Sequence, residues 1–76
     1  MDAMTATAAD LNLPPLSSPA ELARLVGYSE TRIRRCIRAT ETVGGWPPLP
    51  AKRMPDGQLR VTAEAAAEWI NALKDA

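Results

Sequence analysis

Gly27 separates two short segments that each have the apolar spacing of an amphipathic helix, and this break restricts the chain to short helices joined by a tight turn. The first segment, PAELARLV, follows Ser18, a favoured N-cap residue, and carries Glu21 at the third helical position, as in a capping box. It begins with a proline, which is common at the first position of a helix. We expect this helix to bury an apolar stripe of Leu22, Leu25 and Val26.

The second segment, ETRIRRCIR, divides its apolar and basic side chains between two faces. Ser29 is a favoured N-cap residue before it, and Glu30 in the first turn is favourable to the helix dipole. With about 100° between successive residues, Ile33, Cys36 and Ile37 share one face. The opposite face then carries Thr31, Arg34, Arg35 and Arg38, with Arg32 at its flank.

The remainder of the chain predicts a proline-rich connector, a small β-hairpin and a third helix. The connector covers residues 40–50, and Asp56-Gly57 is a hairpin turn signal within residues 51–61. Thr62 is suited to cap the last helix. The apolar residues of that helix with helical spacing are Ala66, Trp69, Ile70 and Leu73.

The fold class that follows is mainly α with a small β-hairpin. A chain of 76 residues buries only about 60% of its unfolded surface, which is enough for one small domain with a marginal core. We expect this domain to cover residues 17–76. Residues 1–16, which include Pro14 and Pro15, are expected to form a flexible N-terminal tail.

The chain has no histidine and one cysteine, which limits its chemistry. Neither a nucleophile activated by histidine nor a zinc site of cysteine and histidine ligands can be built. We therefore expect no enzymatic activity, no metal and no other cofactor. The first residues lack the basic segment and apolar run of a signal peptide, and no stretch is long enough for a membrane span. We expect a cytoplasmic protein that does not contact membranes.

The two helices around Gly27 have the spacing of a helix-turn-helix. Ala23 provides a small residue where the helices would cross most closely, and Gly27 permits the turn four residues later. Ile33 and Cys36 would then point inward, with Tyr28 as a further apolar anchor. Each constrained position of the motif is occupied by a suitable residue.

The second helix of a helix-turn-helix lies in the DNA major groove, so its free positions are candidate DNA contacts. Residues 24–60 include eight basic and three acidic residues, a net charge of +5 in a chain whose total is zero. Arginine can bind guanine or phosphate, and threonine can contact a thymine methyl group. The alternative is a charged helix face that is only solvated. The candidate contacts on this helix are Ser29, Glu30, Thr31, Arg32, Arg34, Arg35 and Arg38.

The predicted hairpin follows this helix in the chain, as the wing of a winged helix does. Basic residues beside its turn can bind the DNA backbone or the minor groove. The alternative is an edge strand whose lysine and arginine residues oppose aggregation. The candidate contacts on the hairpin are Lys52, Arg53, Gln58 and Arg60.

The stretch LSSPAELARLVGYSETRIRRCIR, followed by a proline-rich link and DGQLRVTAEAAAEWINAL, resembles the small winged helix-turn-helix proteins of the excisionase and MerR type. It is also similar to the DNA-binding domain of phage terminase small subunits. The resemblance covers about residues 17–74. The link is longer and richer in proline than is usual in these proteins, and no long coiled-coil helix follows, which a full MerR regulator needs.

This resemblance implies sequence-specific binding of double-stranded DNA by a phage or prophage excisionase, also called a recombination directionality factor. We expect such a protein to act with an integrase. One module of this size buries only about 600–1,000 Å² on DNA, so one copy should bind weakly, and several copies or a partner protein would bind cooperatively. Two alternatives stay open. The same fold can serve transcriptional regulation or the initiation of DNA packaging, and a protein-interaction module would use the apolar and proline-rich surface without binding DNA.

Several residues have a structural and a functional interpretation. We expect Trp69 to lie in the core and Trp46 to cover the core edge rather than stack on a base. Cys36 is expected to act as a small buried hydrophobe. Residues 47–50 match a polyproline ligand but are expected to be a rigid spacer. Glu30 either accepts a hydrogen bond from cytosine N4 or only stabilises the helix dipole.

Overall fold

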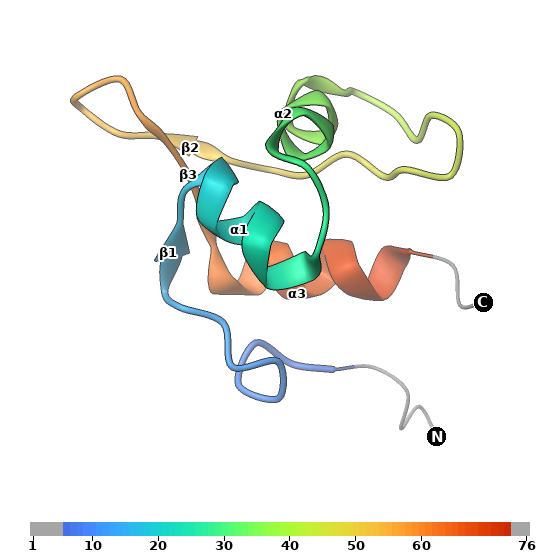
Figure 1. Cartoon of the computed structure of the whole chain (residues 1–76), viewed down its shortest axis with the longest axis horizontal. Coiled ribbons are helices and arrows are strands. Elements are labelled where there is room, and N and C mark those ends of the chain that lie inside the picture. Colours follow the sequence, from blue (N-terminus) through green and yellow to red (C-terminus); the bar gives the residue numbers. More distant parts are fainter. Residues whose placement is uncertain (1–5, 74–76) are drawn as a thin grey trace.

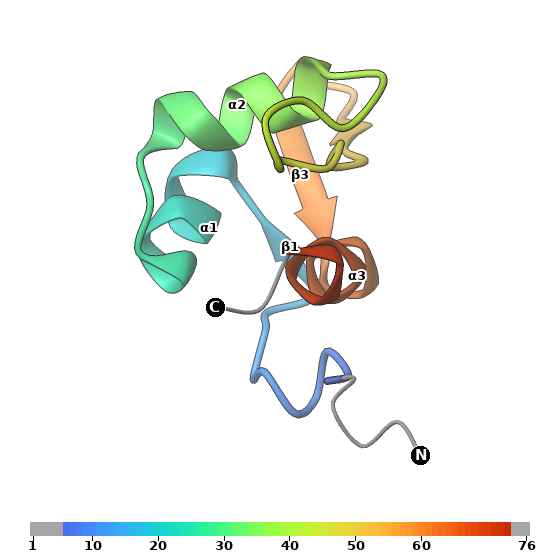
Figure 2. The same ribbon diagram turned by 90° about the vertical axis from the view of Figure 1, so that its right-hand side faces the viewer.

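A computed structural model describes residues 6–73 as three helices and a small three-stranded antiparallel sheet, a mixed α/β arrangement (Figure 1). Figure 2 shows α2 and α3 at opposite ends of β3, with α1 beside them. In chain order the elements are β1 (Leu16–Ser17), α1 (Pro19–Val26), α2 (Glu30–Arg38), β2 (Lys52–Arg53), β3 (Leu59–Thr62) and α3 (Ala63–Ala72).

Side-chain caps and one left-handed glycine set the limits of α1 and α2. The backbone N–H of Glu21 donates to Ser18 Oγ at 3.1 Å, and the N–H of Ser18 donates to Glu21 Oε1 at 2.8 Å, which completes the capping box. Gly27 ends α1 with φ at 77°, a conformation that glycine adopts without steric strain. Ser29 Oγ caps α2 by accepting from the N–H of Arg32 at 3.1 Å. The predicted helix starts and the break between the helices are confirmed.

The sheet contains the predicted hairpin and one strand that was not predicted. Strand β3 lies between β1 and β2, with Ser17 opposite Val61 and Lys52 opposite Arg60. The N–H of Met54 donates to the carbonyl of Gln58 at 2.8 Å, and the turn that it closes includes Gly57 at a φ of 89°. A hairpin turn of this length requires a left-handed residue, as the Asp-Gly signal indicated.

The core takes one large side chain from each of four segments. The fully buried residues are Leu22 on α1, Ile33 on α2, Leu49 in the connector and Val61 on β3. The Trp69 side chain of α3 is also buried, as predicted, and its Nε1–H donates to the carbonyl of Pro47 at 2.9 Å. This bond satisfies the indole N–H, which a buried tryptophan requires, and it joins α3 to the connector.

The folded part of the chain begins before residue 17, where we expected the flexible tail to end. We assigned residues 1–16 to a flexible tail, but Leu16 belongs to β1, and the carbonyl of Pro15 accepts from the N–H of Ala63 at 3.1 Å. The backbone of Ala6 exchanges two hydrogen bonds with the Asn71 side chain on α3. The two prolines precede the strand rather than interrupt it, so they do not prevent this pairing. Residues 1–5 lie outside the described part of the chain.

Two residues that were predicted to be buried are exposed. Leu25 is 53% exposed because the buried face of α1 is centred on Leu22, Ala23 and Pro19, and Leu25 lies to one side of it. Tyr28 is 56% exposed, and its ring lies edge-on to that of Trp46 with 4.9 Å between the centroids. Tyr28 therefore packs on the connector and not in the core between the helices.

The capping box predicts how stability depends on pH. The hydrogen bond from the Ser18 backbone, followed by that with its side chain, lowers the pKa of Glu21. A carboxylate with a lowered folded-state pKa stabilises the protein above its unfolded-state pKa, and this contribution is lost as the pH falls through the folded-state pKa. Glu21→Gln keeps an acceptor for the cap but cannot titrate, so its free energy of unfolding should fall less steeply in acid.

Denaturant unfolding between pH 7 and pH 2 measures this difference. Glu68→Gln removes an exposed carboxylate from the middle of α3, away from any helix cap, and serves as the matched control. If the free energy of unfolding becomes less dependent on pH to the same extent in both variants, the acid-sensitive stability does not come from the capping box.

Candidate nucleic-acid interface

The two faces of α2 differ in burial in the way that the helical spacing predicts. Ile33 and Cys36 are buried against the rest of the domain, and Ile37 is partly buried. The carboxyl end of the helix is also fixed to the connector, since the N–H of Leu49 donates to the carbonyl of Cys36 at 2.9 Å. The opposite, basic face of α2, defined as Thr31, Arg34, Arg35 and Arg38, is exposed along its whole length.

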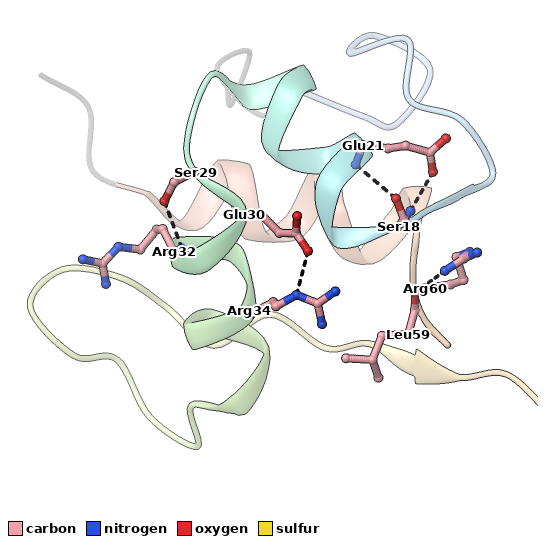
Figure 3. Close-up of polar contacts among 8 residues, drawn as sticks. All are labelled: Ser18, Glu21, Ser29, Glu30, Arg32, Arg34, Leu59 and Arg60. Carbon is pink, nitrogen blue, oxygen red and sulfur yellow. Dashed lines mark hydrogen bonds and ion pairs between the residues drawn. The ribbon is translucent and has the colours of Figure 1, made fainter. Parts of the chain in front are cut away.

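An ion pair lies within this basic face. Arg34 Nε donates to Glu30 Oε2 at 2.8 Å, one helical turn apart (Figure 3). Both side chains remain nearly half exposed, at 44% for Arg34 and 45% for Glu30. The ion pair gives the Arg34 guanidinium a defined direction and also neutralises the carboxylate that stands among the arginines.

Arg32 is placed differently from the other arginines of α2. Its guanidinium carbon lies 4.9 Å from the centroid of the Trp46 ring, within the range of a cation–π contact, and the side chain is half-buried. Figure 3 shows Arg32 and Arg34 extending to opposite sides of α2. Arg32 therefore lies at the border between the basic face and the connector, as its flanking position in the sequence indicated.

Trp46 links α2 to α3 through aromatic contacts that sequence reasoning did not identify. Its ring stacks on that of Trp69 with 6.1 Å between the centroids, while Tyr28 meets it edge-on. Val43 and Trp46 are bridge partners across Gly44 and Gly45, which both have positive φ. Gly-Gly between two residues of high strand propensity is a signal of a two-residue hairpin. This signal could have predicted the turn that brings Trp46 opposite Val43. Its expected place at the core edge is confirmed.

An open hollow of about 240 Å³ lies between the connector and α2. Its lining combines apolar side chains of the connector, including an aromatic ring, with two arginines of the helix. The lining residues are Arg32, Arg35, Cys36, Ala39, Val43 and Trp46.

The hairpin presents its basic residues in different surroundings. Lys52 and Arg53 are exposed, and Arg53 Nη1 donates to the carbonyl of Gly57 at 3.0 Å, while its other N–H groups have no partner within residues 6–73. Gln58 is exposed beside the turn, where its N–H donates to Asp56 Oδ1 at 2.9 Å. In Figure 1 the tip of this hairpin extends away from the helices, on the same side of the molecule as α2.

Arg60 is only partly accessible, although we predicted it as a hairpin contact. Its side chain is half-buried, its Nη1 donates to the carbonyl of Leu59 at 2.7 Å, and its charge contributes to the lowered pKa of Glu21. It lies directly opposite Lys52 in the sheet register. Like charges at such positions repel each other, so an anion near this pair would be stabilising.

Cys36 has the surroundings of a structural residue. Its side chain is buried between α2 and the core, and burial raises the pKa of the thiol. A raised pKa lowers the fraction of nucleophilic thiolate at neutral pH. Within residues 6–73 no group of three histidine, cysteine, aspartate or glutamate side chains comes close enough to hold a metal ion.

Comparison of the chain with protein-family models, with curated protein sequences and with solved structures returns no match. None of the helices within residues 6–73 has the length and hydropathy that crossing a bilayer requires. Interpretation of the basic face therefore depends on the chain's own residues.

The contact between Arg32 and Trp46 predicts that the arginines of α2 contribute unequally to stability. Arg32→Ala removes a partly buried cation–π contact and should lower the free energy of unfolding by about 0.5–1 kcal/mol. Arg35→Ala, on the exposed face of the same helix, should change it by less than about 0.5 kcal/mol. Guanidinium chloride titrations of the two variants and the parent chain measure the difference, and equal destabilisation would contradict the proposed contact.

Proposed function

We propose that this chain is a small winged helix-turn-helix protein that binds double-stranded DNA. Helix α2 enters the major groove, and the β2–β3 hairpin contacts the adjacent backbone or minor groove. The observation that carries this proposal is the exposed basic face of α2, whose arginines all lie opposite the buried Ile33 and Cys36.

The packing of α1 against α2 supports this proposal. Ala23 is buried, and its carbonyl accepts from the N–H groups of Gly27 and Tyr28 at 2.9 Å each. A small residue at the crossing and a left-handed glycine in the turn are what the helix-turn-helix needs. Within residues 6–73, α1 and the connector pack on the apolar side and flank of α2, and the opposite side is exposed and could meet a ligand as large as a duplex.

The distribution of charge supports the same partner. Helix α2 and its flanking hairpin supply basic side chains at two separate places, and a duplex offers phosphates on both sides of its major groove. Lys52 and Arg60 lie opposite each other across the hairpin, and a phosphate would reduce the repulsion between them that the Glu21 carboxylate near Arg60 does not already offset.

The size of the domain indicates how it would act on DNA. A single module of this kind buries about 600–1,000 Å² of protein surface on DNA. One copy should therefore bind weakly, and several copies or a partner protein would bind cooperatively. Within this class, the resemblance of the sequence favours an excisionase-type architectural factor that acts with an integrase. Footprinting across the DNA that surrounds the chain's own gene would separate this role from DNA packaging and transcriptional control.

The basic face of α2 predicts the effect of removing single arginines. Arg34→Ala or Arg35→Ala should weaken specific binding by roughly 1–3 kcal/mol, because each removes a contact to a base or phosphate. Gel-shift titrations on duplexes selected from a random library measure the loss. Arg24→Ala, which removes an exposed arginine from α1, is the matched control and should bind as the parent does.

Two results would contradict DNA binding through this face. One is parent-like affinity in both variants. The other is failure of the parent chain to bind random duplex even at low salt, which would favour the protein-interaction module.

The hairpin predicts a change in salt dependence. Lys52→Ala and Arg53→Ala should each weaken binding to all duplexes alike and reduce the slope of log K against log salt by about 1, since each removes one phosphate contact. The measurement is a series of binding titrations at increasing salt concentration, with Arg24→Ala as the control. An unchanged slope in both hairpin variants would exclude the hairpin from the DNA contact.

A further inference from the structure

The ion pair of Glu30 and Arg34 spans the first five residues of α2 and borders its basic face, within the proposed DNA contact. Glu30 is the first residue of the helix, and its Oε2 accepts from Arg34 Nε at 2.8 Å. Both side chains are nearly half exposed, so the pair remains open to solvent and to a ligand. The bond to Glu30 constrains the direction of the guanidinium (Figure 3).

We propose that Glu30 positions Arg34 to bind O6 and N7 of a guanine in the major groove. The DNA sites that this chain prefers then contain a guanine at the position that Arg34 reaches. This inference rests on the proposed DNA binding and goes beyond it, because it names the base and gives an acidic residue a role within a basic face.

The donors that remain on Arg34 fit this base. A guanidinium carries five N–H donors in a planar fork, and Glu30 uses the one on Nε. The two terminal nitrogens keep four donors. Guanine is the base that presents two acceptors, O6 and N7, in the major groove. Two parallel hydrogen bonds to guanine can therefore form while the bond to Glu30 is retained.

The position of the ion pair along the helix also fits contact with a base. The amino-terminal part of a recognition helix approaches the base edges most closely. Glu30 is the first residue of α2 and Arg34 lies at its centre, whereas Arg38 lies at its carboxyl end and Arg32 is directed toward Trp46. Among residues 6–73, Arg34 is the α2 arginine whose direction is set by an ion pair.

The ion pair contributes only modestly to folding. Exposed pairs one turn apart on a helix contribute little to stability. An arginine that is already directed loses less conformational entropy when it binds. The effect of Glu30 should therefore be seen in the choice of base and hardly at all in unfolding.

The test uses the full chain and duplexes selected by it from a randomised library. In the selected duplex, each G·C pair is replaced in turn by A·T, and guanine is then replaced by 7-deazaguanine, which lacks the N7 acceptor. The parent should lose about 5- to 150-fold in affinity at one G·C pair. Arg34→Ala should be insensitive to that replacement, and Glu30→Ala should show a reduced ratio between the two duplexes.

Two further variants distinguish the effect of directing Arg34 from the effect of removing a negative charge. Glu30→Gln keeps an acceptor for Arg34 Nε and should retain part of the preference for guanine. Glu41→Ala removes an exposed carboxylate outside α2, so it should strengthen binding to all duplexes alike without changing the preference. Denaturant unfolding of Glu30→Ala close to that of the parent would exclude loss of the helix as the cause.

The outcomes distinguish this inference from the function on which it rests. If the parent binds no duplex selectively, the proposed function fails. If it binds selectively but Arg34→Ala remains sensitive to the same guanine, or Glu30→Ala keeps the full preference, only the role of this ion pair is overturned. A preference for cytosine that is lost in Glu30→Ala, with the guanine preference of Arg34 intact, would assign Glu30 to cytosine N4 and also overturn it.

Discussion

The burial of Ile33 determines which side of α2 faces solvent, and that side carries Arg34, Arg35 and Arg38. The Ile33 side chain is fully enclosed, together with Leu22 of α1, Leu49 of the connector and Val61 of β3. A domain of this size has few other large apolar groups to bury. Rotation of α2 about its axis would expose Ile33 and Cys36 while it buried guanidinium groups, and burial of an unpaired charge is strongly unfavourable. The small core therefore holds the basic face outward.

The connector compensates for the small number of core side chains. Prolines restrict its backbone, and two hydrogen bonds attach it to the helices: Leu49 N–H to Cys36 and Trp69 Nε1–H to Pro47. The ring of Trp46 then lies between Arg32 and Trp69. A segment without regular secondary structure thus joins α2 to α3, and it fixes the position of α2 relative to the hairpin that follows.

The features that sequence reasoning predicted correctly depend on neighbours along the chain. Caps at Ser18 and Ser29, the break at Gly27 and the division of α2 into two faces all follow from residues a few positions apart. The features that it missed depend on distant partners. Strand β1 has only two residues and exists because β3 offers it a free edge.

The same distinction applies to the candidate site. The direction of Arg34 comes from Glu30, four residues earlier, and the exposure of Thr31, Arg34, Arg35 and Arg38 was predictable from helical spacing. The contact of Arg32 with Trp46 and the partial burial of Arg60 involve segments that meet only in the folded chain. The helical period predicts which side of a helix is exposed to solvent. It does not predict which distant segment packs on the residues between the exposed and the buried side.

The zero net charge of the chain is compatible with a DNA contact because charges act locally. At physiological ionic strength, interactions between exposed charges are screened over about 8 Å, whereas the molecule extends 41 Å along its longest axis. Helix α3 lies on the other side of α1 from α2 and away from the hairpin tip (Figure 1), and its Glu64 and Glu68 border the N-terminal segment near Thr7. A duplex at the basic face would experience the nearby arginines far more strongly than these distant carboxylates. Two carboxylates would lie within the proposed contact: Asp56 in the hairpin turn, which accepts from the N–H of Gln58, and Glu30, which is matched by the guanidinium of Arg34.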